Sequence, residues 1–361
     1  MSKSIKSFLG ANTPGGFYSL FGQLYNPYKD NRMYIIKGGP GTGKSSFMKK
    51  IAKAASSLGL DTEQIYCSSD PDSLDGVIVP ELGLCVADGT APHVIEPVFP
   101  GASENIINLG AFWDREKLFQ SADEIRSASI ENSLYHRRST RYLSAAGAIN
   151  DDLQKTIVSS VDTEKAESFA VRFCMREAPK KKGSEPGKIR LRFLSAVSPD
   201  GVIFLDSSVT SLASRVIGLA DEYGAVSGIL CERIAQTASK NGYDVIACPC
   251  PMRPKEFEHI IIPELSLALI TVKSSHNISL QTDRLIHARR FIKDDVFQSR
   301  KNRLSFGSKA VRELTDESVA LLRKAKATHD RLESYYIEAM DFVSLDEYIR
   351  DFIDREVYLR A

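Results

Sequence analysis

Short apolar runs and one amphipathic segment alternate in the first part of the chain. Residues 33–36, 64–67 and 82–87 are apolar runs typical of buried strands. Between the first two, residues 45–58 carry apolar side chains three and four positions apart, which predicts a helix. Strand, helix and strand in this order predict a parallel sheet.

The prolines separate this pattern from two long polar–apolar segments. Of fifteen prolines, eight lie in residues 1–100 and seven in residues 179–263. Proline lacks an N–H group and clashes with the preceding turn, so it is excluded from helix interiors. The proline-free stretches, with helical periodicity over 114–145 and 315–355, therefore predict two helical regions.

The same order of segments occurs twice. Positions 51–93 align with 234–276 without a gap, and fourteen of the 43 pairs are identical; we call this the central alignment. Residues 8–16 align with residues 193–201 at a sequence offset slightly longer than that of the central alignment. At a slightly shorter offset Ala148 aligns with Ala327, and we call this the helix alignment. We interpret the chain as a tandem duplication.

The expected fold is α/β: a tandem duplication of a P-loop NTPase-like parallel-sheet domain, each half followed by a long helical region. The expected boundaries are residues 1–178 for the first domain, 179–188 for a Pro-, Gly- and Lys-containing linker, and 189–361 for the second. Within the domains, the α/β cores are expected at about 1–100 and 189–276, and the helical regions at about 101–178 and 277–361.

Composition narrows the class of protein. A hydrophobic fraction of 43% and a charged fraction of 26% exclude wholesale disorder, and a net charge of +1 argues against a nucleic-acid partner. No apolar stretch reaches the roughly 20 residues that span a bilayer, and the N-terminus lacks a signal-peptide core. From these two observations we expect no membrane partner. Six cysteines are too few for a disulfide framework, and we therefore expect a cytoplasmic protein with reduced thiols.

One motif carries chemistry. Residues 38–45 read GGPGTGKS and fit the phosphate-binding pattern G-x-x-x-x-G-K-[ST], the Walker A motif. Between a strand and a helix, such a loop aims its backbone N–H groups and the helix N-terminus at phosphates. Lys44 is expected at the β- and γ-phosphates, and the Ser45 hydroxyl at Mg²⁺. The expected binding residues for Mg²⁺ and ATP are Gly38, Gly39, Pro40, Gly41, Thr42, Gly43, Lys44, Ser45 and Ser46.

Acidic residues follow the neighbouring strands. Asp88 closes the run 82–87, where a carboxylate could hold the magnesium shell beside Ser45; the alternative is a cap for the next turn. Asp70 follows the second strand and could orient a water or accept a proton, whereas Asp72 or Ser73 could cap a helix beginning near residue 74. We therefore assign Lys44, Asp88 and Asp70 as candidate catalytic residues. His93 is a candidate γ-phosphate sensor, with a structural role as the alternative.

The second copy has lost these groups. When the central alignment is extended upstream, Gly38, Lys44 and Asp88 become Asp221, Ser227 and Thr271. Of the loop glycines only Gly41 keeps a glycine, Gly224. Without the lysine, the phosphate nest and the carboxylate, the second half is expected not to bind a nucleoside triphosphate tightly, and to serve packing, regulation or partner binding.

At these motifs the chain resembles the P-loop NTPases. More closely, it resembles a poorly characterised family of bacterial ATPases built from two tandem P-loop domains. The motifs that carry the resemblance are residues 8–16, 38–45, 67–75, 80–82 and 88–93 of the first half, with partial matches in the second. The resemblance implies nucleotide binding and no particular substrate.

Three functions are compatible with this sequence. The first is an ATPase whose cycle moves the helical regions or the second half. The second is a kinase for a small molecule, in which Arg137, Arg138 and Arg141 clamp phosphate; the alternative for these arginines is a solvated helix face. The third is a non-catalytic, nucleotide-sensing protein with an unidentified partner. No guanine-reading motif occurs, which favours ATP, and Gly89 follows Asp88 where many ATP-driven motors carry a second acidic residue.

Overall fold

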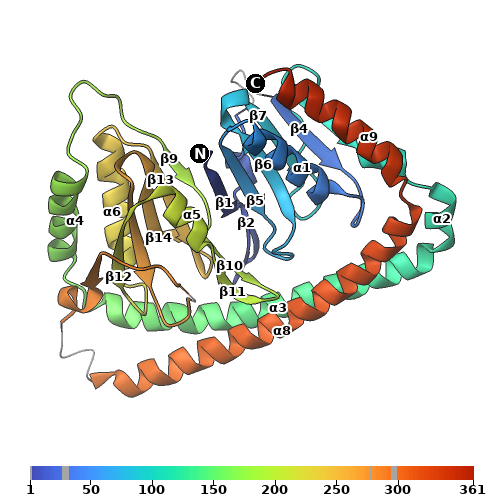
Figure 1. The fold of residues 1–361 in the computed structure, drawn as a ribbon. Helices are drawn as coiled ribbons and strands as arrows, with labels where there is room; N and C mark the ends of the chain where they lie inside the picture. The colour runs from blue at the N-terminus through green and yellow to red at the C-terminus, as the bar shows by residue number, and fades with distance from the viewer. Residues whose placement is uncertain (1, 27–31, 277, 294–298) are drawn as a thin grey trace.

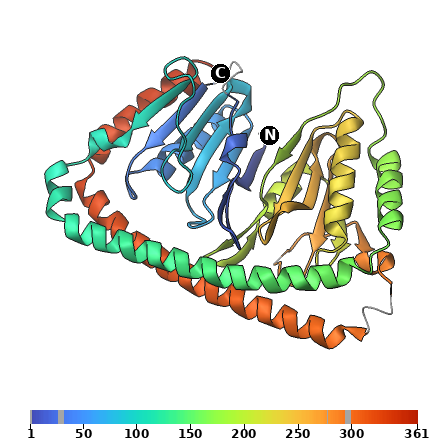
Figure 2. The ribbon, with the colours of Figure 1, turned by 180° about the vertical axis from the view of Figure 1, so that it is seen from behind.

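The computed structural model describes residues 2–26, 32–276, 278–293 and 299–361. Two α/β lobes lie side by side, and a pair of long helices runs beneath both of them (Figure 1). The same arrangement is seen from behind in Figure 2. The chain is α/β, and 48% of it is helical.

The first lobe is built on a six-stranded sheet of order β1-β5-β6-β7-β4-β8. These strands are β1 (Ser4–Phe8), β5 (Thr62–Tyr66), β6 (Leu74–Val79), β7 (Leu84–Asp88), β4 (Arg32–Lys37) and β8 (Glu104–Asn108). Neighbours are parallel except at β6, which pairs antiparallel with both β5 and β7. The sheet is therefore mixed rather than parallel, and a helix beginning near residue 74, which we considered as an alternative, does not form: these residues are strand β6. A local capping pattern suggested that helix, but pairing with β5 and β7 determines the structure there.

The second lobe has a sheet of the same strand order, β16-β12-β15-β14-β13-β9. Its strands are β16 (Arg284–His287), β12 (Arg215–Ala220), β15 (Leu267–Val272), β14 (Arg253–Ile262), β13 (Val245–Cys250) and β9 (Ile189–Leu191). Here β14 is the antiparallel strand. Each lobe also carries a hairpin, made of β2 (Gly10–Thr13) and β3 (Gly16–Ser19) in one and β10 (Ser195–Ser198) and β11 (Gly201–Phe204) in the other.

One helix in each lobe follows the strand next to the β8 or β16 edge and packs on the sheet. It is α1 (Lys44–Ser57) after β4 and α6 (Ser227–Lys240) after β12, and the first residues of the two helices correspond in the central alignment. Side chains alternate across β4 as the two-residue period of a strand requires. Tyr34 and Ile36 join the core beneath α1, and Met33 and Ile35 join the core on the opposite face.

The helical regions cross between the lobes. Helices α3 (Ala122–Val158) and α8 (Lys301–Ala339) pack along each other under both sheets (Figure 1). A short helix, α2 (Arg115–Gln120), precedes α3. At the far ends, α4 (Thr163–Glu177) packs into the core of the second lobe, and α9 (Phe342–Ile353) packs into the core of the first. Each lobe is thus completed by a helix from the other half of the sequence.

The lobes meet through their inner edges. Phe8 and Phe193 exchange two backbone hydrogen bonds of 3.0 Å. Arg192 donates to Glu63 across the same junction, at 2.5 and 3.2 Å; Arg192 is buried and Glu63 is largely shielded from solvent. Helix α5 (Asp206–Leu212) of the second lobe packs on β1 of the first. The lobes therefore share a continuous interior.

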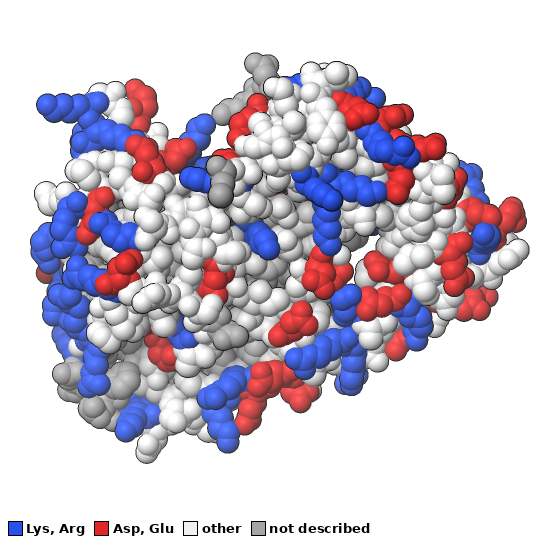
Figure 3. Space-filling view, in the orientation of Figure 1, with Lys and Arg blue, Asp and Glu red and all other residues white. Residues whose placement is uncertain are grey.

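Two of the expected core boundaries fall short of the observed sheets. Strand β8 lies beyond residue 100 and β16 beyond residue 276, because both are brief edge strands with no long apolar run. Segment 179–188 is mostly exposed, but it hydrogen-bonds to residues 239–243 of the second lobe. None of the described helices is both long and apolar enough to cross a membrane. Both signs of charge are spread over the face in Figure 3, in keeping with the net charge of +1.

Candidate functional site

The glycine-rich segment forms a tight turn between β4 and α1. Gly41 and Gly43 adopt φ angles of +69° and +90°, a left-handed conformation that side chains disfavour. Gly43 directly precedes α1 and has no side chain with which to cap this helix N-terminus. Thr42 is buried and donates its hydroxyl to the Gly39 carbonyl, 2.8 Å away, which closes the turn. Among the described residues, no carboxylate caps the first-turn N–H groups of α1, which form a positive helix end.

Lys44 and Asp88 lie together at this turn. The Lys44 ammonium donates to the carbonyls of Gly38 and Gly39, at 3.1 and 2.6 Å, and lies 3.6 Å from Asp88 Oδ2. The other Asp88 oxygen accepts from the backbone N–H and hydroxyl of Thr90, at 2.8 and 2.6 Å. Asp88 thus caps the next turn through one oxygen, as the alternative interpretation expected, and its second oxygen lies near Lys44. Its role towards magnesium stays a prediction.

Gly89, next to Asp88, lies against the sheet. A Cβ atom added there would lie 2.3 Å from Ile35 Cγ2. A second carboxylate after Asp88 would therefore clash with the Ile35 side chain of β4.

The remaining loop residues surround the start of α1. Ser45 accepts a hydrogen bond of 3.0 Å from the backbone N–H of Leu74, at the beginning of β6. Ser46 is exposed, and Pro40 is half-buried. The structure therefore places the predicted loop residues together at the carboxyl end of β4, with Asp88 at the end of the adjacent strand.

The end of α8 covers this loop. A Cβ atom at Gly39 would lie 2.4 Å from the Tyr336 ring, and one at Gly41 would lie 2.8 Å from the Glu333 carbonyl oxygen. The Gly41 N–H group donates to Glu333 Oε1 at 3.1 Å. This contact joins residues 292 positions apart. No local pattern in the sequence pointed to it.

Asp70 also faces α8. One carboxylate oxygen accepts from the Ser73 hydroxyl at 2.6 Å, and the other lies 3.3 Å from Lys326 Nζ. Asp70 is thus brought to the same edge of the sheet as the loop. Both of its oxygens are engaged by protein groups, and its catalytic role stays a prediction.

The other positively charged candidates lie elsewhere. Arg137, Arg138 and Arg141 are exposed on α3. This agrees with the solvated helix face that we considered as the alternative to a phosphate clamp.

The corresponding turn in the second lobe holds its own carboxylate. Asp221 is buried, and its Oδ2 accepts from the backbone N–H groups of Val226 and Ser227, at 2.8 and 2.7 Å. These N–H groups lie at the start of α6, where α1 has an uncapped N-terminus. In the second lobe, therefore, the Asp221 carboxylate binds the N–H groups at the helix N-terminus, whereas the residue that precedes α1 in the first lobe is a glycine.

Sequence reasoning missed a buried acid–histidine pair that occurs in both lobes. His93 Nε2 lies 3.5 Å from Asp75, and its ring stacks on Phe21 at a centroid distance of 4.4 Å. Burial lowers the pKa of His93, but the hydrogen bond and charge of Asp75 outweigh this and raise it. These contacts favour the structural role of His93. The recurrence of His93 as His276 was the available signal.

In the second lobe the same positions hold Glu258 and His276, 3.7 Å apart. Glu258, His259 and His276 bring three potential metal ligands within 4.8 Å of one another. However, His259 Nδ1 accepts the N–H of Thr271 at 3.0 Å, which assigns the proton of the neutral ring to Nε2. Burial lowers the pKa of His259 to about 3, so the ring is neutral at pH 7. A protonated Nε2 cannot ligate a metal, and Lys273 already pairs with Glu258.

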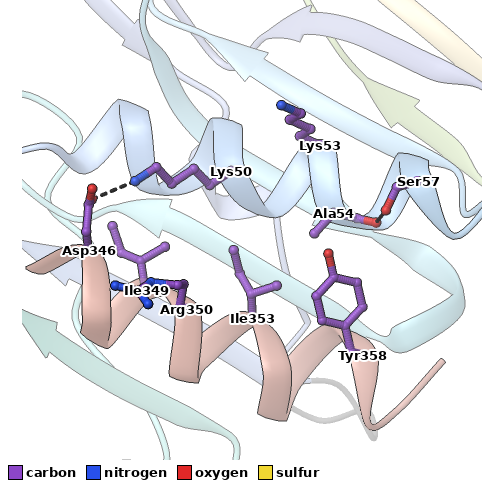
Figure 4. A pocket seen from close by; sticks show the side chains of 9 residues that line it. All are labelled: Lys50, Lys53, Ala54, Ser57, Asp346, Ile349, Arg350, Ile353 and Tyr358. Atoms are coloured by element: carbon purple, nitrogen blue, oxygen red, sulfur yellow. Dashed lines mark hydrogen bonds and ion pairs between the residues drawn. The ribbon is translucent and has the colours of Figure 1, made fainter.

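A groove of about 460 Å³ lies between α1 and α9 (Figure 4). Lys50 and Asp346, 2.6 Å apart, bridge one end of it, and Tyr358 lies at the other. None of the predicted site residues lines this groove.

Comparisons of the chain with protein-family models, with curated proteins and with solved structures found no match.

Proposed function

We propose that the first lobe binds Mg²⁺·ATP at residues 38–46 and that the protein is an ATPase. The observation that carries this proposal is the contrast between two helix N-termini. That of α1 is preceded by glycine and has a lysine and a carboxylate beside it, whereas that of α6 is filled by the buried Asp221. A positive helix end without a carboxylate cap suits a phosphate group.

The donor set fits Mg²⁺·ATP. The Lys44 ammonium donates to loop carbonyls in this structure, and a change of its side-chain rotamer would direct it to the β- and γ-phosphates. Ser45 and Asp88 would supply the oxygen ligands that Mg²⁺ prefers. Bound Mg²⁺ would neutralise charge on the phosphates. The role of the chain itself is to fix the loop, present Lys44 and hold Asp88 through Thr90.

We further propose that the chain arose by tandem duplication and that its second lobe has become a nucleotide-free partner. The equal strand orders, and the correspondence of α1 with α6 in the central alignment, support this. The exchanged helices α4 and α9 tie the second lobe to the first, which gives it a role in packing or regulation.

Calorimetric titration with Mg²⁺·ATP tests the binding site. Lys44→Ala is expected to abolish tight binding, because the described part of the loop offers no other ammonium group to the phosphates. Lys49→Ala removes an exposed lysine of the same helix and is the matched control. Wild-type affinity in Lys44→Ala would show that the loop is not the site.

The reaction is tested with labelled ATP, alone and with a metabolite mixture. Release of free phosphate by the wild type, and its loss in Lys44→Ala, is the expected result. A labelled metabolite would identify a kinase instead. Binding without either product would identify a nucleotide sensor.

A further inference from the structure

The position of Glu333 bears on how ATP could reach the loop. Its carboxylate accepts the N–H of Gly41, one of the backbone donors that a phosphate-binding loop offers to its ligand. We propose that Glu333 is an internal anion that a nucleoside triphosphate must displace. This inference rests on the proposed nucleotide site.

Glu333 is held in its ionised form. Its neighbour His329, one helical turn earlier, lies 3.4 Å from the carboxylate. The hydrogen bonds from His329 and Gly41 outweigh partial burial and the nearby charge of Asp70, and so lower the pKa of Glu333. A carboxylate and a phosphate both require the Gly41 N–H, and two anions within about 4 Å repel each other. Occupation of the loop by both is therefore unfavourable.

The matching contact in the second lobe lacks this charge. Gln154 corresponds to Glu333 in the helix alignment, and it approaches Gly224, which corresponds to Gly41 in the central alignment. The Gln154 amide donates to the Gly224 carbonyl at 3.0 Å. Helix α8 therefore carries an anion over the loop that precedes α1, whereas helix α3 carries a neutral amide over the loop that holds Asp221.

Displacement of Glu333 involves the whole end of α8. Tyr336 packs on Gly39 and lies beside Trp113, at a ring-centroid distance of 5.9 Å, and Lys326 is paired with Asp70. Because α8 packs along α3 beneath both lobes, a shift at Glu333 is transmitted towards the second lobe (Figure 1). The ligand that opens this contact is a nucleoside triphosphate, whose phosphates compete directly for the Gly41 N–H.

Glu333→Gln tests the inference, since the amide retains size and removes charge. Titration of the full chain with Mg²⁺·ATP is expected to show about tenfold tighter binding in Glu333→Gln than in the wild type. Glu338→Gln, which changes an exposed glutamate of the same helix, is expected to bind as the wild type does. Equal affinities in wild type and Glu333→Gln, with both folded by circular dichroism, would overturn the internal anion and leave the nucleotide site standing.

Hydrogen exchange provides a second measurement. Peptides over residues 326–339 are expected to exchange faster when Mg²⁺·ATP is added to the wild type, and to be unchanged by ATP in Lys44→Ala. Unchanged exchange in a wild type that binds ATP would overturn the displacement. If neither the wild type nor Glu333→Gln binds ATP, the proposed site itself is wrong and the inference fails with it.

Discussion

Ser139 of α3 and Ser318 of α8 share a hydrogen bond of 2.7 Å between their hydroxyl groups, and both side chains are buried. The two residues are counterparts in the helix alignment. Phe8 and Phe193, counterparts in the alignment of 8–16 with 193–201, likewise bond to each other. A residue meets its own counterpart only on a two-fold axis. The lobes are therefore arranged about an approximate two-fold axis, which supports the proposed duplication.

The serine pair predicts non-additive changes in stability. Ser139→Ala leaves the Ser318 hydroxyl buried without its partner and should lower the free energy of unfolding by about 1–2 kcal/mol, and Ser318→Ala should do the same. The double variant removes both polar groups and is expected to cost less than the sum of the two. Urea unfolding of all four proteins measures this, with exposed Ser133→Ala as the control. Strict additivity would mean that the pair contributes no coupling.

The ion pair of Glu63 with Arg192 at the junction between the lobes is expected to make the stability of the fold sensitive to acid. Burial raises the pKa of Glu63, but the charge and hydrogen bond of Arg192 outweigh it, so the pKa lies below its ordinary value. A lowered carboxyl pKa stabilises the fold above the unfolded value, about 4.3, and this contribution is lost as the pH falls through the folded pKa.

Glu63→Gln should therefore cost about 3–5 kcal/mol of unfolding free energy at pH 7, because it leaves Arg192 buried and unpaired. The difference from the wild type should shrink as the pH is lowered towards 3. Chemical denaturation across this range measures it, with exposed Glu167→Gln as the control. A difference that stays constant with pH would exclude Glu63 as the titrating group.

The part of the site that is local in sequence was predictable. The loop pattern lies between its strand and its helix as expected, because the turn depends on glycines and on the elements beside it. Strand β6 was not predicted, and a capping pattern before it left a helix open as an alternative, because the pairing of β6 with β5 and β7 cannot be read from local sequence. The Gly41–Glu333 contact depends on the path of α8 across the lobes. No local sequence pattern predicts a contact between residues so far apart in the chain.

The same distinction applies to the acid–histidine pairs. The sequence repeat marks His93 and His276, but their partners differ, Asp75 in one lobe and Glu258 in the other. The mixed sheet brings each acid beside its histidine from a neighbouring strand. The sequence repeat therefore identifies the two histidines, whereas the pairing between strands determines which acidic side chain contacts each of them.

Asp88→Asn is expected to weaken the magnesium dependence of turnover more than ATP binding. The amide retains an oxygen that can accept from Thr90, as Asp88 does now, but it loses the charge that would hold the metal's water shell. Activity measured against magnesium concentration, together with calorimetric ATP affinity, separates the two effects. Asp72→Asn changes an exposed carboxylate at the same edge and should behave as the wild type. An Asp88→Asn magnesium curve identical to the wild type's would exclude this role.

The wild-type chain is expected to bind one ATP, in the first lobe. In the second lobe Lys44 and Asp88 are replaced by Ser227 and Thr271, and the Asp221 carboxylate already accepts the N–H groups at the start of α6. Charge-assisted contacts contribute about 1.5–3 kcal/mol each, so the loss of two or three weakens binding by roughly a thousandfold or more. Equilibrium dialysis at micromolar ATP should therefore plateau near one per wild-type chain and near zero in Lys44→Ala. A plateau near two, or a full site remaining in Lys44→Ala, would mean that the second lobe binds phosphate through groups other than this loop.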